Sequence, residues 1–182
     1  MSVSLIVMGA AGRMGSILAR LISEAPDLTL AAVLERPGHE DKLNAWEAGG
    51  TRVETDPAVA MTALPGAVVV DFTAPEATMS TARLAAAHGN PMVIGTTGLT
   101  DGNKAELSEL AKRVPLFLSP NMSVGVNVLL EVLPELTRLL GEAYDVELTE
   151  IHHKHKKDAP SGTAVRLAEA LAEARGRKLD ET

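Results

Sequence analysis

The residues most able to do chemistry lie in one short run near the end of the chain, from His152 to Lys157. This run holds three of the seven lysines and three of the five histidines of a chain whose net charge is −7. Imidazole exchanges protons near neutral pH, and ammonium groups neutralise anions. The run therefore indicates a site that binds and protonates an anionic small molecule.

The run is predicted to close a long strand that begins near Tyr144. Side chains alternate between the two faces of a strand. His152 and Lys156 would then share a face and could point at the same ligand, whereas His153 would lie on the opposite face. A role for both histidines at one ligand requires a bend in the strand.

A metal site and a solvated charge run are the two alternatives for this segment. His-x-His spacing is available for a metal, but the interleaved lysines raise the cost of holding Zn²⁺, and the chain has no cysteine. We therefore expect no metal. Clustered charges are most often surface residues, and that alternative stays open.

The loop after the run favours the anion site. Asp158-Ala159-Pro160 forces a turn, and Ser161-Gly162-Thr163 presents small residues and free amides at the start of a helix predicted over residues 164–175. A carboxylate held there would lie beside Lys156. Capping of the helix by Ser161 or Thr163 is the alternative, and both roles can coexist.

A second candidate site is the segment Gly9-Ala10-Ala11-Gly12-Arg13-Met14-Gly15, which follows an apolar run at residues 3–8. Small residues at a strand-to-helix turn let the backbone approach a pyrophosphate, whose charge the free amides of the helix stabilise. Glu35 follows Gly15 by 20 residues, where a ribose-binding acid is expected. The segment predicts dinucleotide binding, with a tight structural turn as the alternative.

Glu35 and Arg36 bear on which dinucleotide binds. Glu35 can accept hydrogen bonds from both ribose hydroxyls of NAD and would repel a 2′-phosphate, whereas Arg36 could pair with that phosphate. The pair predicts tolerance of both NADH and NADPH without ranking them. A solvated surface role for Arg36 is the alternative.

Three later loops are predicted to lie at the carboxyl ends of strands, where open parallel sheets bind ligands. Gly95-Thr96-Thr97-Gly98 could hold a nicotinamide or a ribose, and Ser119-Pro120-Asn121-Met122 could do the same. In the third loop, residues 71–76, Thr73 or Pro75 begins a helix, and capping explains this loop as well as a cofactor contact does.

These sites require a particular order of elements. Strands are predicted from apolar, β-branched runs at residues 3–8, 28–34, 67–72, 91–94 and 115–118, with Val53 a candidate for one more. Helical patterns alternate with them, so the fold class is α/β, a Rossmann-type doubly wound parallel sheet. A long amphipathic helix over residues 124–140 then opens part of an α+β domain for substrate binding and oligomerisation. We expect a dinucleotide-binding domain at residues 1–122 and a substrate-binding domain, incomplete at its C-terminus, at residues 123–182.

The composition excludes several classes of protein. No window approaches the roughly 18 consecutive apolar residues of a membrane helix, and 46% hydrophobic with 23% charged residues is ordinary globular composition. A net charge of −7 and 2% aromatic residues argue against nucleic acid as a partner. The start of the chain lacks the pattern of a signal peptide and cysteine is absent, so a cytoplasmic protein is expected.

Across residues 7–164 the chain resembles the dihydrodipicolinate reductases, also called 4-hydroxy-tetrahydrodipicolinate reductases, of the diaminopimelate route to lysine. The most specific part of the resemblance is His152-His153-x-x-Lys156-x-Asp158-Ala159-Pro160-Ser161-Gly162-Thr163. It also rests on the glycine turn, Glu35-Arg36, Asp71-Phe72-Thr73, Gly95-Thr96-Thr97-Gly98 and residues 121–127. It implies reduction of 4-hydroxy-tetrahydrodipicolinate, a cyclic imine dicarboxylate, to tetrahydrodipicolinate with NADH or NADPH.

The resemblance also implies roles for individual residues. His152 is the proton donor or acceptor and Lys156 a further proton donor, while His153, Gly162 and Thr163 bind the substrate. Contacts with the cofactor are implied for Gly9, Ala10, Ala11, Gly12, Arg13, Met14, Glu35, Arg36, Gly95, Thr96, Thr97, Ser119, Pro120, Asn121 and Met122. Met122 stands where family members often carry an aromatic residue, so stacking on the nicotinamide is not assumed. Family members are cytoplasmic homotetramers, and we expect the same of the full-length protein.

The implied chemistry agrees with the residues, because hydride addition to a conjugated imine builds negative charge that a cationic neighbourhood stabilises. Two other functions remain open. The first is a nucleotide-binding or sensing module without catalysis, which the end of the chain at Thr182 favours, since family members continue further. The second is another two-domain dehydrogenase, acting on aspartate or homoserine, although that would not explain the double histidine and the Ser-Gly-Thr loop.

Overall fold

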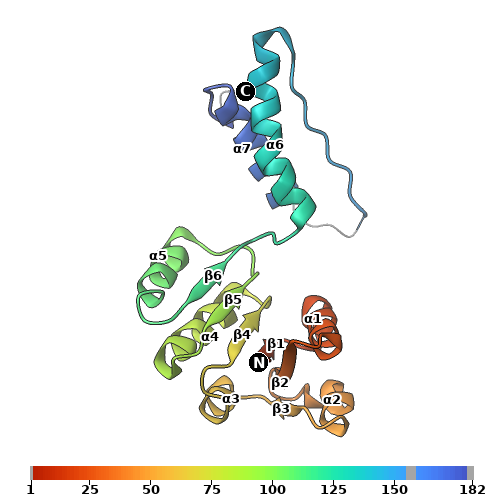
Figure 1. Ribbon diagram of the computed structural model, residues 1–182, viewed down its shortest axis with the longest axis vertical. Helices are drawn as coiled ribbons and strands as arrows, with labels where there is room; N and C mark the ends of the chain where they lie inside the picture. The colour runs from red at the N-terminus through yellow and green to blue at the C-terminus, as the bar shows by residue number, and fades with distance from the viewer. Residues whose placement is uncertain (1, 155–158, 180–182) are drawn as a thin grey trace. The chain divides into compact units, whose positions relative to one another are not determined.

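The computed structural model describes residues 2–154 and 159–179 of the chain. The chain forms two compact units, Met1–Pro120 and Asn121–Thr182, whereas the boundary proposed from the sequence lies after residue 122. The first unit is a sheet with helices, and the regular elements in the described part of the second are helices (Figure 1).

The first unit is built on a six-stranded parallel sheet in the order β3-β2-β1-β4-β5-β6. In chain order the strands are β1 Val3–Met8, β2 Leu28–Leu34, β3 Arg52–Glu54, β4 Val68–Asp71, β5 Met92–Ile94 and β6 Leu116–Leu118. The strand order reverses between β1 and β4, which is the topology of the Rossmann fold. The predicted Rossmann-type sheet is confirmed.

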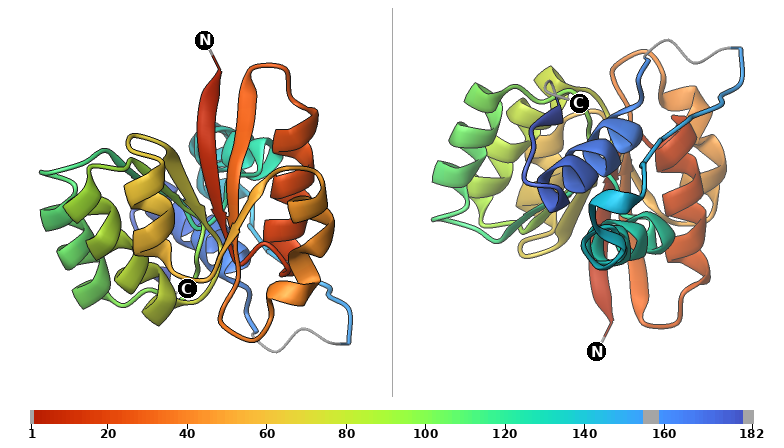
Figure 2. Two further views of the ribbon diagram at one scale, coloured as in Figure 1. Left: turned by 90° about the horizontal axis from the view of Figure 1, so that it is seen from below. Right: turned by 90° about the horizontal axis from the view of Figure 1, so that it is seen from above.

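Helices cover both faces of this sheet (Figure 2). In chain order they are α1 Arg13–Glu24, the 3₁₀-helix η1 Glu40–Leu43, α2 Asn44–Ala48, α3 Pro57–Ala63, α4 Pro75–His88 and α5 Asp101–Leu110. Neighbouring side chains of β1 enter different cores: Ile6 packs in a cluster with Met79 of α4, and Val7 in a cluster with Ile22 of α1. A strand buried on both faces must be apolar throughout, which is why these runs could be recognised in the sequence.

A shift of register between β1 and β2 lets the two strands end side by side at the carboxyl edge of the sheet. Leu5 pairs with Leu30 and Ile6 with Ala32, so β2 has one extra residue, and the two strands end with Met8 opposite Leu34. The residues that follow, Gly9 and Glu35, therefore begin their loops next to each other at the carboxyl edge.

Two short helices were not predicted from the sequence. They are α2 and α3, and the second of them carries a recognisable start signal. Asp56 caps α3, because its Oδ1 accepts a hydrogen bond from the Ala58 amide at 2.8 Å, and Pro57 occupies the first position. Aspartate followed by proline is a common helix start.

The described part of the second unit contains α6 Val124–Leu140, the 3₁₀-helix η2 Gly141–Ala143 and α7 Gly162–Ala174, and α6 packs against α7. The strand predicted from Tyr144 to Lys156 is wrong for its described residues, since residues 144–153 have no strand pairing and are drawn as a plain trace in Figure 1. A strand needs a neighbour to receive its backbone hydrogen bonds, and alternation of side chains does not supply one.

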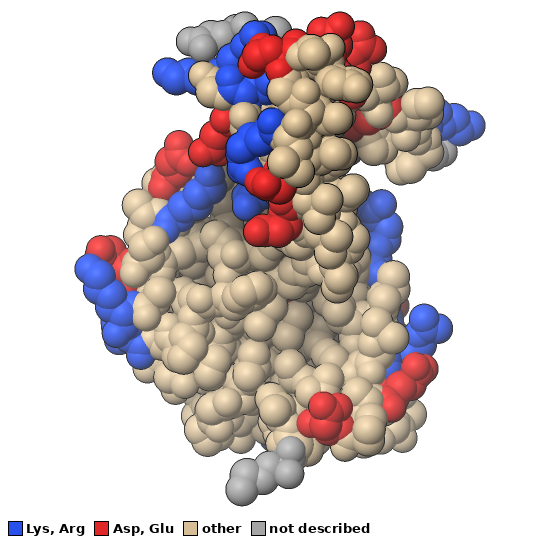
Figure 3. Space-filling view, turned by 45° about the horizontal axis from the view of Figure 1, so that its top comes forward, with Lys and Arg blue, Asp and Glu red and all other residues tan. Residues whose placement is uncertain are grey.

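Charged side chains lie mainly at the margins of the first unit on the face shown in Figure 3, with both signs present. One ion pair joins two helices of this unit: Arg83 of α4 donates two hydrogen bonds to Glu106 of α5, at 2.6 and 2.9 Å. Both side chains are exposed, so water and salt weaken this pair. Among the described helices, none is long and apolar enough to cross a membrane.

Candidate functional site

The loop between β1 and α1 forms a tight turn at the carboxyl edge of the sheet. The Ala10 amide donates to the Leu34 carbonyl at 2.9 Å, and the Gly12 amide donates to the Gly9 carbonyl at 2.9 Å. Gly12 is the N-cap of α1 and supplies no side-chain cap. The first amides of α1 thus point out of the helix end without a capping side chain, which is the arrangement that binds phosphate.

Two glycines of this turn are required by its geometry. A Cβ on Gly15 would lie 2.1 Å from the Gly9 carbonyl oxygen and 2.8 Å from the Ala10 Cα. Gly9 has a φ of +61°, and a Cβ there would lie 2.8 Å from Cγ2 of Thr73. The absent side chain of Gly15 lets the backbone of α1 approach the turn this closely, and that of Gly9 leaves room for Thr73.

The Glu35 carboxylate is fixed beside the turn by two main-chain amides. Its Oε2 accepts from the Ala11 amide at 3.2 Å, and its Oε1 accepts from the Arg36 amide at 3.0 Å. Each carboxylate oxygen has a further lone pair, so both could also accept from a ribose hydroxyl. The position and the acceptor set fit the role predicted for Glu35.

A cleft of about 620 Å³ lies in the first unit over this turn. Of the predicted cofactor contacts, it is lined by Gly9, Ala11, Gly12, Glu35 and Arg36. A glycine turn that a Cβ would fill, free helix amides and an acid at the end of β2 fit a nicotinamide dinucleotide. The cleft would hold its adenosine and pyrophosphate.

The same cleft contains two basic residues that were missed in the sequence, His39 and Lys42. The His39 amide donates to the Arg36 carbonyl at 3.2 Å, and the Lys42 amide donates to the His39 carbonyl at 3.2 Å. Side chains three residues apart in such turns lie on the same side. Buried Leu43 anchors the segment in the core, and the spacing of basic residues between Glu35 and this leucine was the signal available.

The side chains of two predicted cofactor residues are buried and cannot contact a ligand. Ala10 is buried at 1% exposure. Thr96 is also buried, and its hydroxyl lies 2.7 Å from the Thr78 hydroxyl and 3.4 Å from Oδ1 of Asp71. A contact of Ala10 or Thr96 with the cofactor would have to use the main chain.

Buried Asp71 connects the loops after β4 and β5. Its Oδ1 accepts from the Thr73 amide at 2.8 Å, from the Thr73 hydroxyl at 2.6 Å and from the Thr78 hydroxyl at 3.1 Å. The Thr73 hydroxyl therefore serves Asp71, while α4 begins at Pro75 after an Ala74 N-cap without a side-chain cap. Thr73 also occupies the space that a Cβ on Gly9 would need, so this loop lies next to the glycine turn.

In the second unit, Glu150 joins the predicted proton donor to the loop that begins α7. Its Oε2 lies 2.7 Å from Nε2 of His152, and its Oε1 accepts from the Ser161 amide at 2.8 Å. Ser161 in turn caps α7, because its Oγ accepts from the Ala164 amide at 3.0 Å. Glu150 received no role from the sequence, although it lies only two residues before His152.

Hydrogen bonds from the Ser161 side chain, from His152 and from the Ser161 amide lower the pKa of Glu150 from 4.5 to about 2. The Glu150 carboxyl therefore binds a proton less tightly in the folded state than in the unfolded state. The stabilisation of the fold by the ionised carboxylate is fully present above pH 4.5 and is lost as the pH falls through about 2.

We expect the free energy of unfolding to fall more steeply between pH 4.5 and about 2 in the wild type than in Glu150→Gln. Denaturant titrations followed by circular dichroism across this range measure the difference. Glu147→Gln, at an exposed position of the same segment, is the control and should keep the wild-type slope. A constant difference between wild type and Glu150→Gln at every pH would contradict the assignment.

Two other predicted contacts meet within the second unit. Asn121, a predicted cofactor contact, donates from Nδ2 to Oγ1 of Thr163, a predicted substrate ligand, at 3.0 Å. Oδ1 of Asn121 also accepts from the Ser123 amide at 2.9 Å, so the asparagine side chain is fixed from both ends. The predicted catalytic Lys156 lies outside the described residues. Among the residues that are described, no group of three or more His, Cys, Asp or Glu could hold a metal ion.

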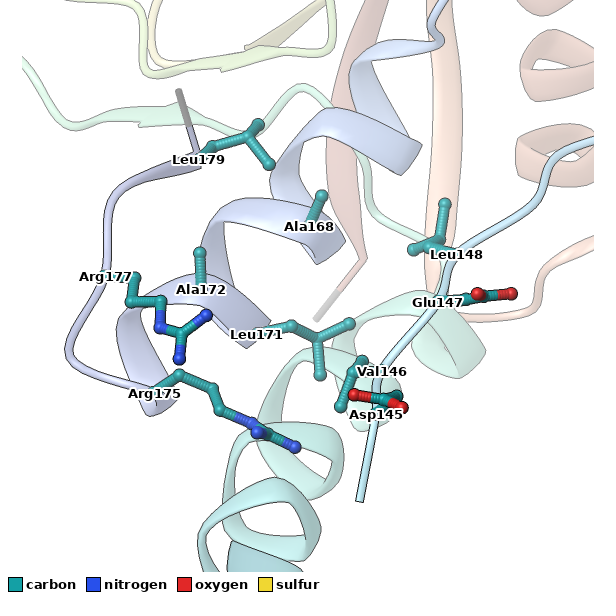
Figure 4. A pocket seen from close by; sticks show the side chains of 10 residues that line it. All are labelled: Asp145, Val146, Glu147, Leu148, Ala168, Leu171, Ala172, Arg175, Arg177 and Leu179. Atoms are coloured by element: carbon teal, nitrogen blue, oxygen red, sulfur yellow. The ribbon is translucent and has the colours of Figure 1, made fainter. Parts of the chain in front are cut away.

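A separate pocket of about 500 Å³ lies in the second unit between residues 145–148 and the end of α7 (Figure 4). Its walls combine Val146, Leu148 and Leu171 with the guanidinium groups of Arg175 and Arg177. Glu142 lies 3.6 Å from Arg175 and 3.4 Å from Arg177. Of the predicted substrate and cofactor residues that the structure describes, none lines this pocket, so it is not the predicted site.

The chain matches two family profiles that together span both units. Residues 3–122 match the profile described as dihydrodipicolinate reductase, N-terminus, and residues 125–182 match dihydrodipicolinate reductase, C-terminus. It is 62% identical over 175 residues to the 4-hydroxy-tetrahydrodipicolinate reductase of Nitratidesulfovibrio vulgaris strain DP4, over 96% of this chain and 66% of the relative. It is 56% identical over 181 residues to that of strain DSM 19637 / Miyazaki F, over 100% of this chain and 69% of the relative. The chain thus spans about two thirds of the length of these relatives.

Solved structures agree with these matches. A dipicolinate-bound dihydrodipicolinate reductase from Paenisporosarcina sp. TG-14 has a TM-score of 0.77 and 28% sequence identity, over 96% of this chain and 67% of that one. GenD2 from gentamicin A biosynthesis in complex with NAD has a TM-score of 0.58 and 22% identity, over 72% of this chain and 38% of that one. The second likeness is one of fold alone.

Proposed function

The chain belongs to the dihydrodipicolinate reductase family, and on that premise we propose that it reduces 4-hydroxy-tetrahydrodipicolinate to tetrahydrodipicolinate with NADH or NADPH. The observation that carries the proposal is the placement of His152 beside the loop that begins α7, through their shared partner Glu150. A proton donor next to the free amides of a helix start suits a dicarboxylate that must be held and protonated at once.

In this proposal the first unit provides most of the contacts with the cofactor, and the second unit provides the residues that bind and protonate the substrate. In the first, the glycine turn, the amides of α1 and Glu35 hold and orient the dinucleotide. When bound, the reduced nicotinamide supplies a hydride. Gly95, Thr96, Thr97, Ser119, Pro120, Asn121 and Met122 are the remaining proposed contacts with the cofactor.

The proposed substrate residues stabilise the negative charge that develops on the ring of the cyclic imine during hydride addition. Overall, one hydride and one proton are consumed and one water is released from the hydroxylated ring. His152 donates the proton, and Lys156 neutralises a carboxylate and serves as a further donor. His153, Gly162 and Thr163 bind the substrate. Stabilisation of the developing negative charge lowers the barrier more than it lowers the energy of the bound imine.

The test of this function is consumption of NADH or NADPH by the purified protein in the presence of the cyclic imine. We expect oxidation that depends on the imine. Tight cofactor binding without consumption of the imine would instead support a nucleotide-binding module. We further propose that the full-length protein is a cytoplasmic homotetramer, which sedimentation equilibrium of that protein would test.

Cofactor preference gives a separate prediction, because Arg36, His39 and Lys42 line the cleft on one side of their segment. A 2′-phosphate placed there would gain charge-assisted contacts that the 2′-hydroxyl of NADH lacks. We expect Lys42→Ala to weaken binding of adenosine 2′,5′-bisphosphate by about three- to tenfold and to leave binding of 5′-AMP unchanged. Isothermal titration calorimetry measures both dissociation constants.

The matched control is Lys104→Ala, because Lys104 lies on α5 and pairs with Asp101, outside the cleft. It should leave both constants unchanged. Equal weakening of the two nucleotides by Lys42→Ala would show that the lysine does not read the 2′-phosphate.

A further inference from the structure

Among the described residues, Glu150 contacts both His152 and the residue before α7, Ser161. The two carboxylate oxygens are divided between them, with Oε2 at 2.7 Å from the histidine ring and Oε1 at 2.8 Å from the Ser161 amide. The side chain of Glu150 is 23% exposed and that of His152 39% exposed. The histidine therefore keeps an open side for a ligand while one ring nitrogen is engaged.

The contact decides which ring nitrogen carries a fixed proton. An ionised carboxylate only accepts hydrogen bonds, so Nε2 of His152 must be the N–H donor. The low pKa of Glu150, about 2, keeps it ionised at any pH at which the protein would work. In the neutral ring of His152, Nδ1 then carries no proton. Nδ1 is therefore the nitrogen that can accept a proton and donate it.

We propose that Glu150 is a positioning residue, which fixes a proton on Nε2 of His152 so that Nδ1 delivers the transferred proton, and which ties this histidine to the loop that begins α7. The assignment rests on the proposed function, since it names the atom through which His152 acts. An aspartate performs the same task behind the histidine of a Ser-His-Asp triad, where it sets the tautomer and the orientation of the ring.

The two oxygens of the Glu150 carboxylate contact different partners, which favours a positioning role over a purely structural one. Ser161 already caps α7 with its own hydroxyl, so the helix start does not depend on Glu150 for its cap. Holding an exposed histidine in one orientation costs side-chain entropy, which the short contact with Oε2 offsets. Glu150 therefore holds the His152 ring beside the loop that begins α7.

The first readout is the tautomer of His152, measured by ¹⁵N NMR of the histidine rings with His152→Ala to assign the signals. We expect the Nε2–H tautomer to dominate in the neutral ring of the wild type and a mixture of tautomers in Glu150→Ala. This readout does not depend on turnover, so it decides the contact even if the proposed reductase activity fails.

The second readout is kinetic. We expect Glu150→Ala to lower kcat by on the order of a hundredfold, within the range that a general acid contributes, and to leave the affinity for NADPH unchanged. In Glu150→Gln the amide oxygen can accept from only one of the two donors while its NH₂ group faces the other, so we expect an intermediate loss. Glu147→Gln, at an exposed position of the same segment, is the control and should keep the wild-type kcat.

Two results would overturn the proposal. One is an unchanged Nε2–H tautomer in Glu150→Ala, and the other is a kcat within about twofold of wild type in both Glu150 variants. Circular dichroism and NADPH affinity report whether each variant is folded. If the wild type itself does not reduce the imine, the proposed function fails while the tautomer result still stands for or against Glu150.

Discussion

Replacing His152 with alanine is expected to lower turnover of the cyclic imine by roughly two to four orders of magnitude, the range that general acid catalysis contributes. The dissociation constant for NADPH should stay within about twofold of wild type, because the glycine turn and Glu35 that would hold the dinucleotide lie in the first unit. Steady-state assays of NADPH oxidation and fluorescence titration of the cofactor measure the two effects.

Lys156→Ala should behave in the same way if Lys156 is a further proton donor, with NADPH binding preserved. His88→Ala is the control, since His88 is an exposed histidine in the last turn of α4. Unchanged turnover in both His152→Ala and Lys156→Ala would refute the proposed mechanism.

Gly15→Ala should remove most of the affinity for the dinucleotide. The new Cβ would lie 2.1 Å from the Gly9 carbonyl oxygen and 2.7 Å from the Gly9 carbonyl carbon, both of them backbone atoms that no side-chain rotation can move. Forcing extra atoms into a packed site costs about 1–3 kcal/mol or more, and each 1.4 kcal/mol is tenfold in affinity. We therefore expect NADH and NADPH to bind at least about tenfold more weakly, with a lower Tm.

Gly102→Ala is the matched control for this change. Gly102 lies in α5, and the nearest atom to its Cβ would be Oγ1 of Thr100 at 3.7 Å, an ordinary contact. It should keep wild-type affinity and stability or gain slightly in stability, because alanine favours a helix. Wild-type cofactor affinity in Gly15→Ala would mean that the turn does not form the cofactor cradle.

The sheet could be predicted from the sequence because its strands are buried on both faces. The runs at residues 3–8 and 28–34 were placed with the bounds that the structure gives β1 and β2. The helices α2 and α3 were missed because five and seven residues are too few for a clear helical period. The strand expected from Tyr144 was wrong for its described residues because its pairing depends on a partner that a local pattern cannot reveal.

The candidate site could be predicted in part for a similar reason. Residue types and spacing indicated His152, the Ser161-Gly162-Thr163 loop and Glu35, whose individual roles stay predictions. The sequence could not show that the Thr96 hydroxyl turns inward to Thr78, since the two lie 18 residues apart and meet only when β4 and β5 pair. It could have indicated Glu150 by its closeness to His152 along the chain, but only the fold brings Ser161 to the other carboxylate oxygen.

The central proposal is that this protein binds a nicotinamide dinucleotide and uses His152 to protonate the imine that it reduces. The most direct measurement follows the amounts of NADPH oxidised and tetrahydrodipicolinate formed over time, for the wild type and for His152→Ala at saturating NADPH. We expect the wild type to oxidise one NADPH for each imine reduced and the variant to turn over almost none of either compound, with equal cofactor binding in both. Bound NADPH that the wild type does not oxidise, or equal turnover in the two proteins, would contradict the proposal.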